Sequence, residues 1–184
     1  MREELFGPAI HLRAACGLLD PTWVVGDLGC GTGAMSAALA PFVSRVIAVD
    51  NSAAMLAAAR RRLAGAETVE LRRGDLEELP VGDAELDAAV LTLVLPYLSD
   101  PGRVLAEVAR GVRPGGRLLV TDLLPHDRET YRQQLGHHWL GFSEPQMAGW
   151  LTAAGFTDLR FHALTPAPEA KGPGLFVAGG RRSS

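Results

Sequence analysis

Short apolar runs alternate along the chain with stretches in which apolar residues recur every three or four positions. The runs are rich in β-branched and aliphatic residues, which is typical of strands. We predict strands at 23–28, 45–50, 69–73, 86–94, 117–122, 157–163 and 175–179. The almost wholly apolar 86–94 suits a central strand, whereas the alternating 69–73 suits a strand near an edge. Strands that alternate with helices predict an α/β fold, with a mostly parallel sheet between helical layers.

Helix start and stop signals fit this pattern. Pro8 precedes a first predicted helix within 1–20, and its apolar face contains Leu12, Ala15, Cys16 and Leu19. Residues suited to cap later helices are Ser52, Asp100 and Ser143. Ser143 forms a capping box with Gln146, and Gly155 is placed to end that helix. Pro114-Gly115-Gly116 predicts a turn before the strand at 117–122.

Length and composition restrict the class of protein. The chain has 184 residues, enough for a single domain with a sizeable core over 1–184. A net charge of −3 argues against a dedicated nucleic-acid binder, which normally carries a basic surface. The two cysteines cannot form a disulfide framework, and we find neither a signal peptide nor an apolar run of membrane-spanning length. These features predict a cytoplasmic protein.

The strongest functional signal is the sequence V-V-G-D-L-G-C-G-T-G at 24–33. A predicted strand leads into glycines at 29, 31 and 33, followed by a predicted helix. Glycines let the backbone turn sharply and let a ligand approach, and the helix end favours an anionic group. Gly29, Gly31 and Ala34 also satisfy the dinucleotide-binding pattern, and a tight turn without a ligand is a further alternative.

Three acidic residues argue against a nicotinamide or flavin cofactor. Asp27 precedes the first loop glycine, where a carboxylate suits a ligand ammonium group better than a pyrophosphate. Asp50 ends the second predicted strand, a position from which an acid binds ribose hydroxyls. Asp75 follows the third strand and can accept from an adenine amino group, while Leu76 covers the ring.

Taken in order, D-L-G-C-G-T-G, V-I-A-V-D, G-D-L and R-P-G-G-R-L-L-V resemble the motifs of class I S-adenosylmethionine (SAM) methyltransferases. The resemblance covers roughly residues 19–122 and is strongest to the ubiquinone/menaquinone-type C-methyltransferases. The later H-H-W-L-G-F-S segment, from 137, resembles methyltransferase domains that follow a winged-helix module of the arsenical-resistance type in bacterial regulators. The resemblance implies a seven-stranded Rossmann-like sheet whose last strand is antiparallel.

The resemblance also implies roles for individual residues. The three loop glycines would line the methionine and ribose parts of SAM, and Asp27 would face the amino group. Thr92 and Leu93 would close the site from the fourth strand. The full set of expected cofactor-binding residues is Asp27, Gly29, Gly31, Gly33, Asp50, Asn51, Asp75, Leu76, Thr92 and Leu93. The alternatives are structural: Asp50 could cap the helix after Ser52, Asp75 could form an Asx-turn, and Thr92 and Leu93 could be core residues.

The acceptor side is less well specified. We expect it at 124–156, where the candidate side chains are His126, Asp127, Tyr131, His137 and His138. Of these, His126, Tyr131 and His137 are the candidates for a general base. The alternative is that these residues belong to a charged surface helix and its packing. Adjacent His137 and His138 point in different directions on a helix and lack partners at ligand spacing, so we expect no metal. Tyr97 stands where relatives often carry histidine, and it could contact the adenosine or the acceptor.

The sequence therefore predicts methyl transfer from SAM to a small-molecule acceptor, with S-adenosylhomocysteine as product. It does not name the acceptor, and it leaves open a homodimer. A non-catalytic SAM-binding sensor is the main alternative, because the cofactor half is better specified than the acceptor half. A nicotinamide-dependent oxidoreductase is a third alternative, which the position of the sole lysine, Lys171, in a terminal loop disfavours.

Overall fold

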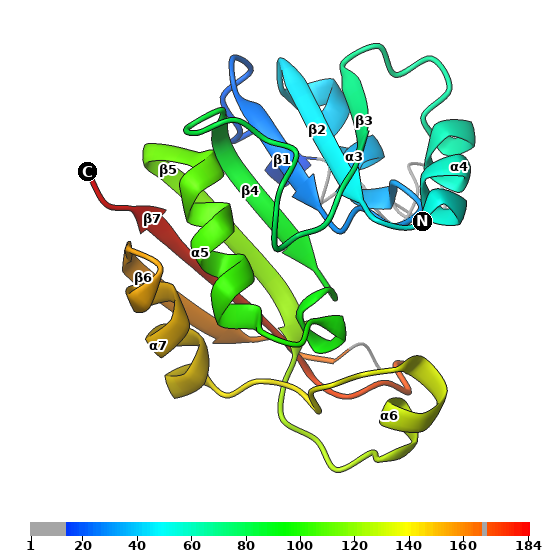
Figure 1. The fold of residues 1–184 in the computed structure, drawn as a ribbon, viewed down its shortest axis with the longest axis vertical. Coiled ribbons are helices and arrows are strands. Elements are labelled where there is room, and N and C mark those ends of the chain that lie inside the picture. The colour runs from blue at the N-terminus through cyan, green and yellow to red at the C-terminus, as the bar shows by residue number, and fades with distance from the viewer. Residues whose placement is uncertain (1–13, 167–168) are drawn as a thin grey trace.

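Seven strands form one sheet in the computed structural model, which describes residues 14–166 and 169–184 (Figure 1). Their order across the sheet is β3-β2-β1-β4-β5-β7-β6. The strands are β1 (Val24–Leu28), β2 (Arg45–Asp50), β3 (Val69–Arg73), β4 (Leu86–Thr92), β5 (Val112–Leu123), β6 (Phe156–Ala163) and β7 (Leu175–Arg182).

Strands β1 to β5 run parallel to one another, and β7 runs antiparallel to both β5 and β6. This arrangement confirms the predicted Rossmann-like sheet with an antiparallel last strand. The central position of β4 and the edge position of β3 also agree with their apolar and alternating sequences. Because β1 to β4 are parallel, the loops that follow them meet at one edge of the sheet.

Helices cover both faces of the sheet. They are α3 (Ala34–Leu39), α4 (Ala53–Arg62), α5 (Pro101–Gly111), α6 (Thr130–Leu135) and α7 (Glu144–Ala153), with short 3-10 turns η1 (Ala40–Phe42) and η2 (Leu95–Tyr97). In Figure 1, α5 and α7 lie in front of the sheet and α3 lies behind it. The predicted caps are confirmed, since side chains of Ser52, Asp100 and Ser143 accept hydrogen bonds from the first turns of α4, α5 and α7. The described helices include none with the length and apolar character needed to cross a bilayer.

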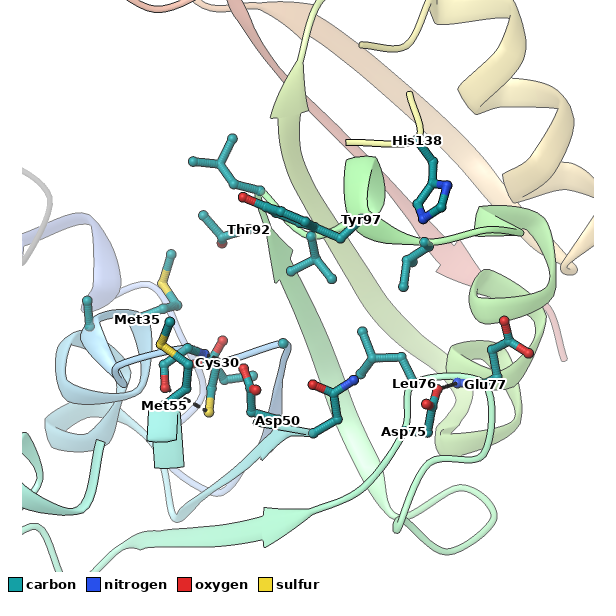
Figure 2. A pocket seen from close by; sticks show the side chains of 18 of the residues that line it. Cys30, Met35, Asp50, Met55, Asp75, Leu76, Glu77, Thr92, Tyr97 and His138 are labelled. Carbon is teal, nitrogen blue, oxygen red and sulfur yellow. Dashed lines mark hydrogen bonds between the residues drawn. The ribbon is translucent and has the colours of Figure 1, made fainter. Parts of the chain in front are cut away.

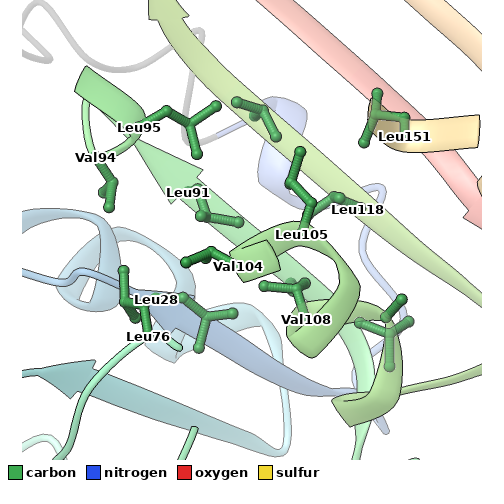
Figure 3. Close-up of a cluster of buried hydrophobic side chains, with 14 of the residues drawn as sticks. Leu28, Leu76, Leu91, Val94, Leu95, Val104, Leu105, Val108, Leu118 and Leu151 are labelled. Carbon is green, nitrogen blue, oxygen red and sulfur yellow. The ribbon is translucent and has the colours of Figure 1, made fainter. Parts of the chain in front are cut away.

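The larger part of the core lies beneath α5 and α7. Val104, Leu105 and Val108 on α5 are completely buried against the sheet (Figure 3). Phe142, Phe156 and Phe176 extend this cluster towards the antiparallel edge. Burial of each such side chain contributes roughly 1.5–3 kcal/mol, so this layer fixes the strands on which the loops are mounted.

Two expectations, one about a turn and one about a buried helix face, are wrong. Pro114-Gly115-Gly116 does not precede the fifth strand but lies within it, because β5 pairs with β4 at Leu86↔Val112 and again at Ala88↔Arg117. The extra residues form a bulge, in which Gly115 has a φ of 78°. In the predicted first helix, Leu12 lies outside the described residues, and Ala15 is exposed rather than buried.

Two glycines, one within α7 and one just after it, provide a test of this packing. Gly149 is exposed within the helix, and a Cβ there would have no atom within 4 Å, whereas Gly155 has a φ of 85° and its Cβ would lie 2.5 Å from Arg182 Nη1. We expect Gly149→Ala to raise the free energy of unfolding by about 0.5–1 kcal/mol, because alanine is the better helix former. Gly155→Ala should lower it by about 1–2 kcal/mol. Urea unfolding checks both changes, and equal effects of the two substitutions would contradict this account of the helix end.

Candidate functional site

The loop between β1 and α3 is shaped by three glycines with positive φ, at 78° for Gly29, 51° for Gly31 and 76° for Gly33. A Cβ at Gly29 would lie 2.6 Å from Val94, and one at Gly33 would lie 2.9 Å from Leu63 at the end of α4. Gly31 differs, because no atom lies within 4 Å of its Cβ position. Gly29 and Gly33 therefore permit close packing, whereas Gly31 borders open space that a ligand can occupy.

Asp50 connects this loop to β2. Its Oδ2 accepts a hydrogen bond of 2.8 Å from the amide of Gly31, and its Oδ1 accepts one of 2.8 Å from the amide of Ser52. The second bond forms an Asx turn before α4. The structural alternative, in which Asp50 caps that helix, is wrong, because the Ser52 hydroxyl is the cap and accepts from the amide of Met55. Asp50 also borders the cavity described below, so the structural and ligand-binding roles are compatible.

Asp27 is a buried carboxylate at the end of β1, with 2% of its surface exposed. The Ser36 hydroxyl, on α3, donates a hydrogen bond to its Oδ2. Burial raises the pKa of Asp27 to about 6, and the nearby negative charge of Asp50 contributes in the same direction. The ionised carboxylate is therefore costly in the ligand-free protein, which favours binding of a positive group beside it.

Residues after β3 complete the same side of the site. The amide of Glu77 donates a 2.9 Å hydrogen bond to Asp75 Oδ1, which is the turn expected as the structural alternative for Asp75. Leu76 is buried and packs into the main core cluster. Asn51, Asp75 and Leu76 all border the cavity.

The end of β4 is held by Asp122, a completely buried carboxylate at the end of β5. It accepts hydrogen bonds from the amides of Val94, Leu95 and Leu123, at 3.2, 3.1 and 2.8 Å. Burial raises the pKa of Asp122 to about 6. Just before these amides, Leu93 adopts a φ of 56° and remains 44% exposed. Asp122 was not predicted from the sequence, although an acidic residue at the end of a buried strand is a recognisable signal.

These elements enclose a cavity of about 710 Å³ at the carboxyl edge of the sheet (Figure 2). Nine of the ten sequence-predicted cofactor residues line it, and Gly33 is the exception because it packs against α4. Several other lining residues were not predicted from the sequence, among them Met35, Met55 and Glu77, whereas His138, a candidate on the acceptor side, does line the cavity. Cys30 also lines the cavity, but burial raises the pKa of its thiol to about 12, so it is not a thiolate nucleophile.

The three candidate bases lie together, but none lines this cavity. His126 and Tyr131 meet edge to face with ring centroids 5.1 Å apart, and Tyr131 meets His137 at 5.5 Å. His137 in turn contacts Tyr97 at 4.7 Å, and Tyr97 does line the cavity. Burial lowers the pKa of both His126 and His137, which favours neutral rings. The cluster thus supports the wall of the cavity from behind.

Comparison with known proteins agrees with this geometry. A family model described as "Methyltransferase domain" matches residues 26–120, which include the glycine loop and strands β2 to β4. The demethylmenaquinone methyltransferase of Clavibacter sepedonicus is 31% identical over 83% of this chain and 73% of its own length. This chain belongs to the class I SAM-dependent methyltransferases.

Further similar proteins are found both by sequence and by structure. A malonyl-[acyl-carrier protein] O-methyltransferase of Serratia marcescens is 37% identical over 61% of the chain, which spans only 42% of that relative's length. Among solved structures, a SAM-dependent methyltransferase from Mesorhizobium loti has a TM-score of 0.77 and 22% identity, covering 95% of this chain and 97% of that one. A Haemonchus contortus phosphoethanolamine N-methyltransferase solved with SAM has a TM-score of 0.80 and 16% identity. The match covers 99% of this chain and 56% of that one. The two structural matches establish the shared fold.

Asp27 gives a stability prediction for this methyltransferase. Its raised pKa means that the folded state binds a proton more tightly than the unfolded state, so its contribution to stability falls as pH rises from about 4 through 6. Asp27→Asn removes the buried charge and leaves an oxygen to accept from Ser36. We expect the free energy of unfolding at pH 8, without ligand, to rise by up to about 3 kcal/mol, and the gain to vanish near pH 4.

Urea unfolding across this pH range measures the effect. Asp127→Asn is the matched control, because Asp127 is exposed and its substitution should change stability by less than about 0.5 kcal/mol. A gain for Asp27→Asn that is the same at both pH values would show that burial of the charge is not its cause.

Proposed function

We propose that this protein transfers a methyl group from SAM, bound at the acidic side of the cavity, to a small-molecule acceptor that enters beside η2. The observation that carries the proposal is the convergence of the predicted cofactor residues from four separate loops on one cavity. The open space at Gly31 supports it, because a side chain there would meet no protein atom but would meet a ligand.

SAM and this cavity are complementary in charge. The ligand carries an ammonium and a sulfonium group against one carboxylate, and the cavity presents Asp27, Asp50 and Asp75. Asp27 is assigned to the ammonium group, since a positive partner offsets the cost of its buried negative charge.

The adenosine part is assigned to the loops after β2 and β3. Asp50 has both oxygens fixed by backbone amides, which leaves further lone pairs oriented for the ribose hydroxyls. Asn51 lies beside it, and Asp75 and Leu76 are assigned to the amino group and the face of adenine. Thr92 and Leu93 close the cavity from β4.

SAM supplies an electrophilic methyl group: an electron pair of the acceptor forms the new bond as the carbon–sulfur bond breaks onto sulfur. The protein's contribution is to hold the acceptor in line with that bond, which can supply roughly 7–11 kcal/mol of the barrier reduction. The proton that the acceptor loses passes to water or to His138, which lines the cavity.

Calorimetric titration with SAM, S-adenosylhomocysteine and NAD tests the cofactor. We expect the two adenosyl ligands to bind and NAD not to bind. Gly31→Ala should weaken SAM binding at least about tenfold, because the added methyl group occupies the ligand's approach volume. Binding of NAD alone, or SAM affinity unchanged in Gly31→Ala, would contradict the assignment.

Gly65→Ala is the matched control for this substitution. Gly65 has a φ of 87° and open space at its Cβ position, so it shares the backbone strain of Gly31 but lies outside the cavity. Both variants should lose a similar amount of stability, about 1–2 kcal/mol, and only Gly31→Ala should lose SAM affinity.

The pKa of Asp27 predicts the pH dependence of binding. Below about pH 6 the ligand-free carboxyl is protonated, so SAM must displace that proton to form the ion pair. We expect affinity to fall as pH decreases through 6, with proton release on binding. Titrations at about pH 5.5 in buffers of different ionisation enthalpy measure the protons released. Asp27→Asn should bind more weakly and show no such release; an unchanged pH profile in this variant would assign the effect to another group.

A further inference from the structure

The cavity has two chemically different sides. Its lining includes four acidic side chains, Asp27, Asp50, Asp75 and Glu77, and a largely apolar group made of Leu93, Tyr97, Leu98 and His138. Figure 2 shows Tyr97 and His138 across the cavity from Asp50, Asp75 and Glu77. No lysine or arginine lines the cavity among the residues that the structure describes. Among the described residues, the side left for the acceptor therefore contributes no fixed charge of either sign.

Asp50, Asp75 and Glu77 already have partners within the protein. Asp50 accepts hydrogen bonds from two backbone amides, and Asp75 accepts one. Glu77 forms an ion pair of 3.1 Å with Arg103 and accepts a hydrogen bond from the Ser99 hydroxyl. These contacts keep the carboxylates on their own loops. They are consequently not available to neutralise a cation on the opposite side of the cavity.

On the opposite side, large apolar groups are exposed to the cavity. Leu93 is 44% exposed and Tyr97 51% exposed, although most leucines in this fold are buried. Leu93 also holds a backbone φ of 56°, a conformation that costs a side-chain-bearing residue energy. A strained and exposed leucine at the lip of a cavity is expected where the side chain contacts a ligand.

This apolar surface is rigidly supported. The amides of His138 and Trp139 donate to Pro96 O at 2.7 and 3.4 Å, and the Trp139 indole donates to Leu98 O at 3.0 Å. The segment after α6 is therefore joined to η2 on both sides of Tyr97. His137 supports the Tyr97 ring from behind, with centroids 4.7 Å apart. A surface that is ordered before binding loses little entropy when it takes up a ligand.

We propose that the methyl acceptor is an uncharged, mainly apolar molecule bound against Leu93, Tyr97, Leu98 and His138. This inference rests on the proposed function, because it places SAM on the acidic side. An anionic acceptor would find no lysine or arginine among the described lining residues, would have only the sulfonium as a cationic neighbour, and would share the cavity with four acidic side chains, which is unfavourable. A cationic acceptor would meet no free carboxylate on its own side and would lie beside the positive sulfonium.

Three probes with one ring system and different charge test the acceptor class: naphthol, naphthoate and naphthyltrimethylammonium. Each is titrated calorimetrically at about pH 7.5 into protein saturated with S-adenosylhomocysteine. We expect naphthol to bind at least about tenfold more tightly than either charged probe. Equal or tighter binding of a charged probe, or no binding of naphthol, would overturn the proposal. The preceding titration with S-adenosylhomocysteine reports separately on the proposed function.

A charge introduced into the apolar side gives a second test. Tyr97→Arg should reverse the preference between naphthol and naphthoate, because it supplies the missing cationic partner. Leu135→Arg is the control: Leu135 is 48% exposed on α6 and does not line the cavity, so this variant should keep the wild-type preference. A folded Tyr97→Arg variant that still binds S-adenosylhomocysteine and still prefers naphthol would place the acceptor elsewhere.

Discussion

The hydrogen bond from the Gly31 amide to Asp50 joins the two loops that form the centre of the site. It holds the glycine loop across the ends of β1 and β2, with the backbone at a φ of 51° that glycine tolerates readily. Because Asp50 is also bonded to the amide of Ser52, the start of α4 is positioned by the same carboxylate. Together with the hydrogen bonds from the amides of Gly29 and Cys30 to Val49 O, this carboxylate links the segments that lead into α3 and α4.

The same edge of the sheet contains two buried carboxylates that serve different purposes. Asp122 accepts from three backbone amides and fixes the chain after β4, so its burial is compensated within the protein. Asp27 accepts from the Ser36 side chain, and its remaining capacity faces the cavity. Burial raises the pKa of both carboxyls to about 6, but of the two only Asp27 lines the cavity, where a positive group can approach it. The buried negative charge of Asp27 thus lowers the stability of the protein and at the same time favours a cationic ligand.

The fold, and the grouping of the expected cofactor residues around one cavity, could be predicted from the sequence because their determinants are local. Bounds of β2 and β3 agree with the predicted 45–50 and 69–73, since each apolar run begins and ends at a polar residue or a turn. The glycine loop and the acids after β1, β2 and β3 lie next to the strands that position them. The bulge in β5 was mistaken for a turn, because Pro114-Gly115-Gly116 has turn composition and only pairing with β4 on both sides makes it part of a strand. Asp122 was missed for the same reason, since two of the amides it binds lie 27 and 28 residues earlier in the chain.

The proposed acceptor side is formed by segments that are distant in the sequence, and its chemistry could therefore not be predicted from local motifs. Its side chains come from the turn after β4 and from the segment after α6, which are joined by hydrogen bonds such as His138 to Pro96. Neither segment has a motif that specifies an acceptor, and the three side chains predicted as bases, His126, Tyr131 and His137, do not line the cavity. The informative feature is the absence of fixed charge among the described residues on that wall, together with the exposure of Leu93 and Tyr97. Such a surface selects its ligand by desolvation and shape, so relatives with the same cofactor loops can differ in acceptor through a few exposed positions.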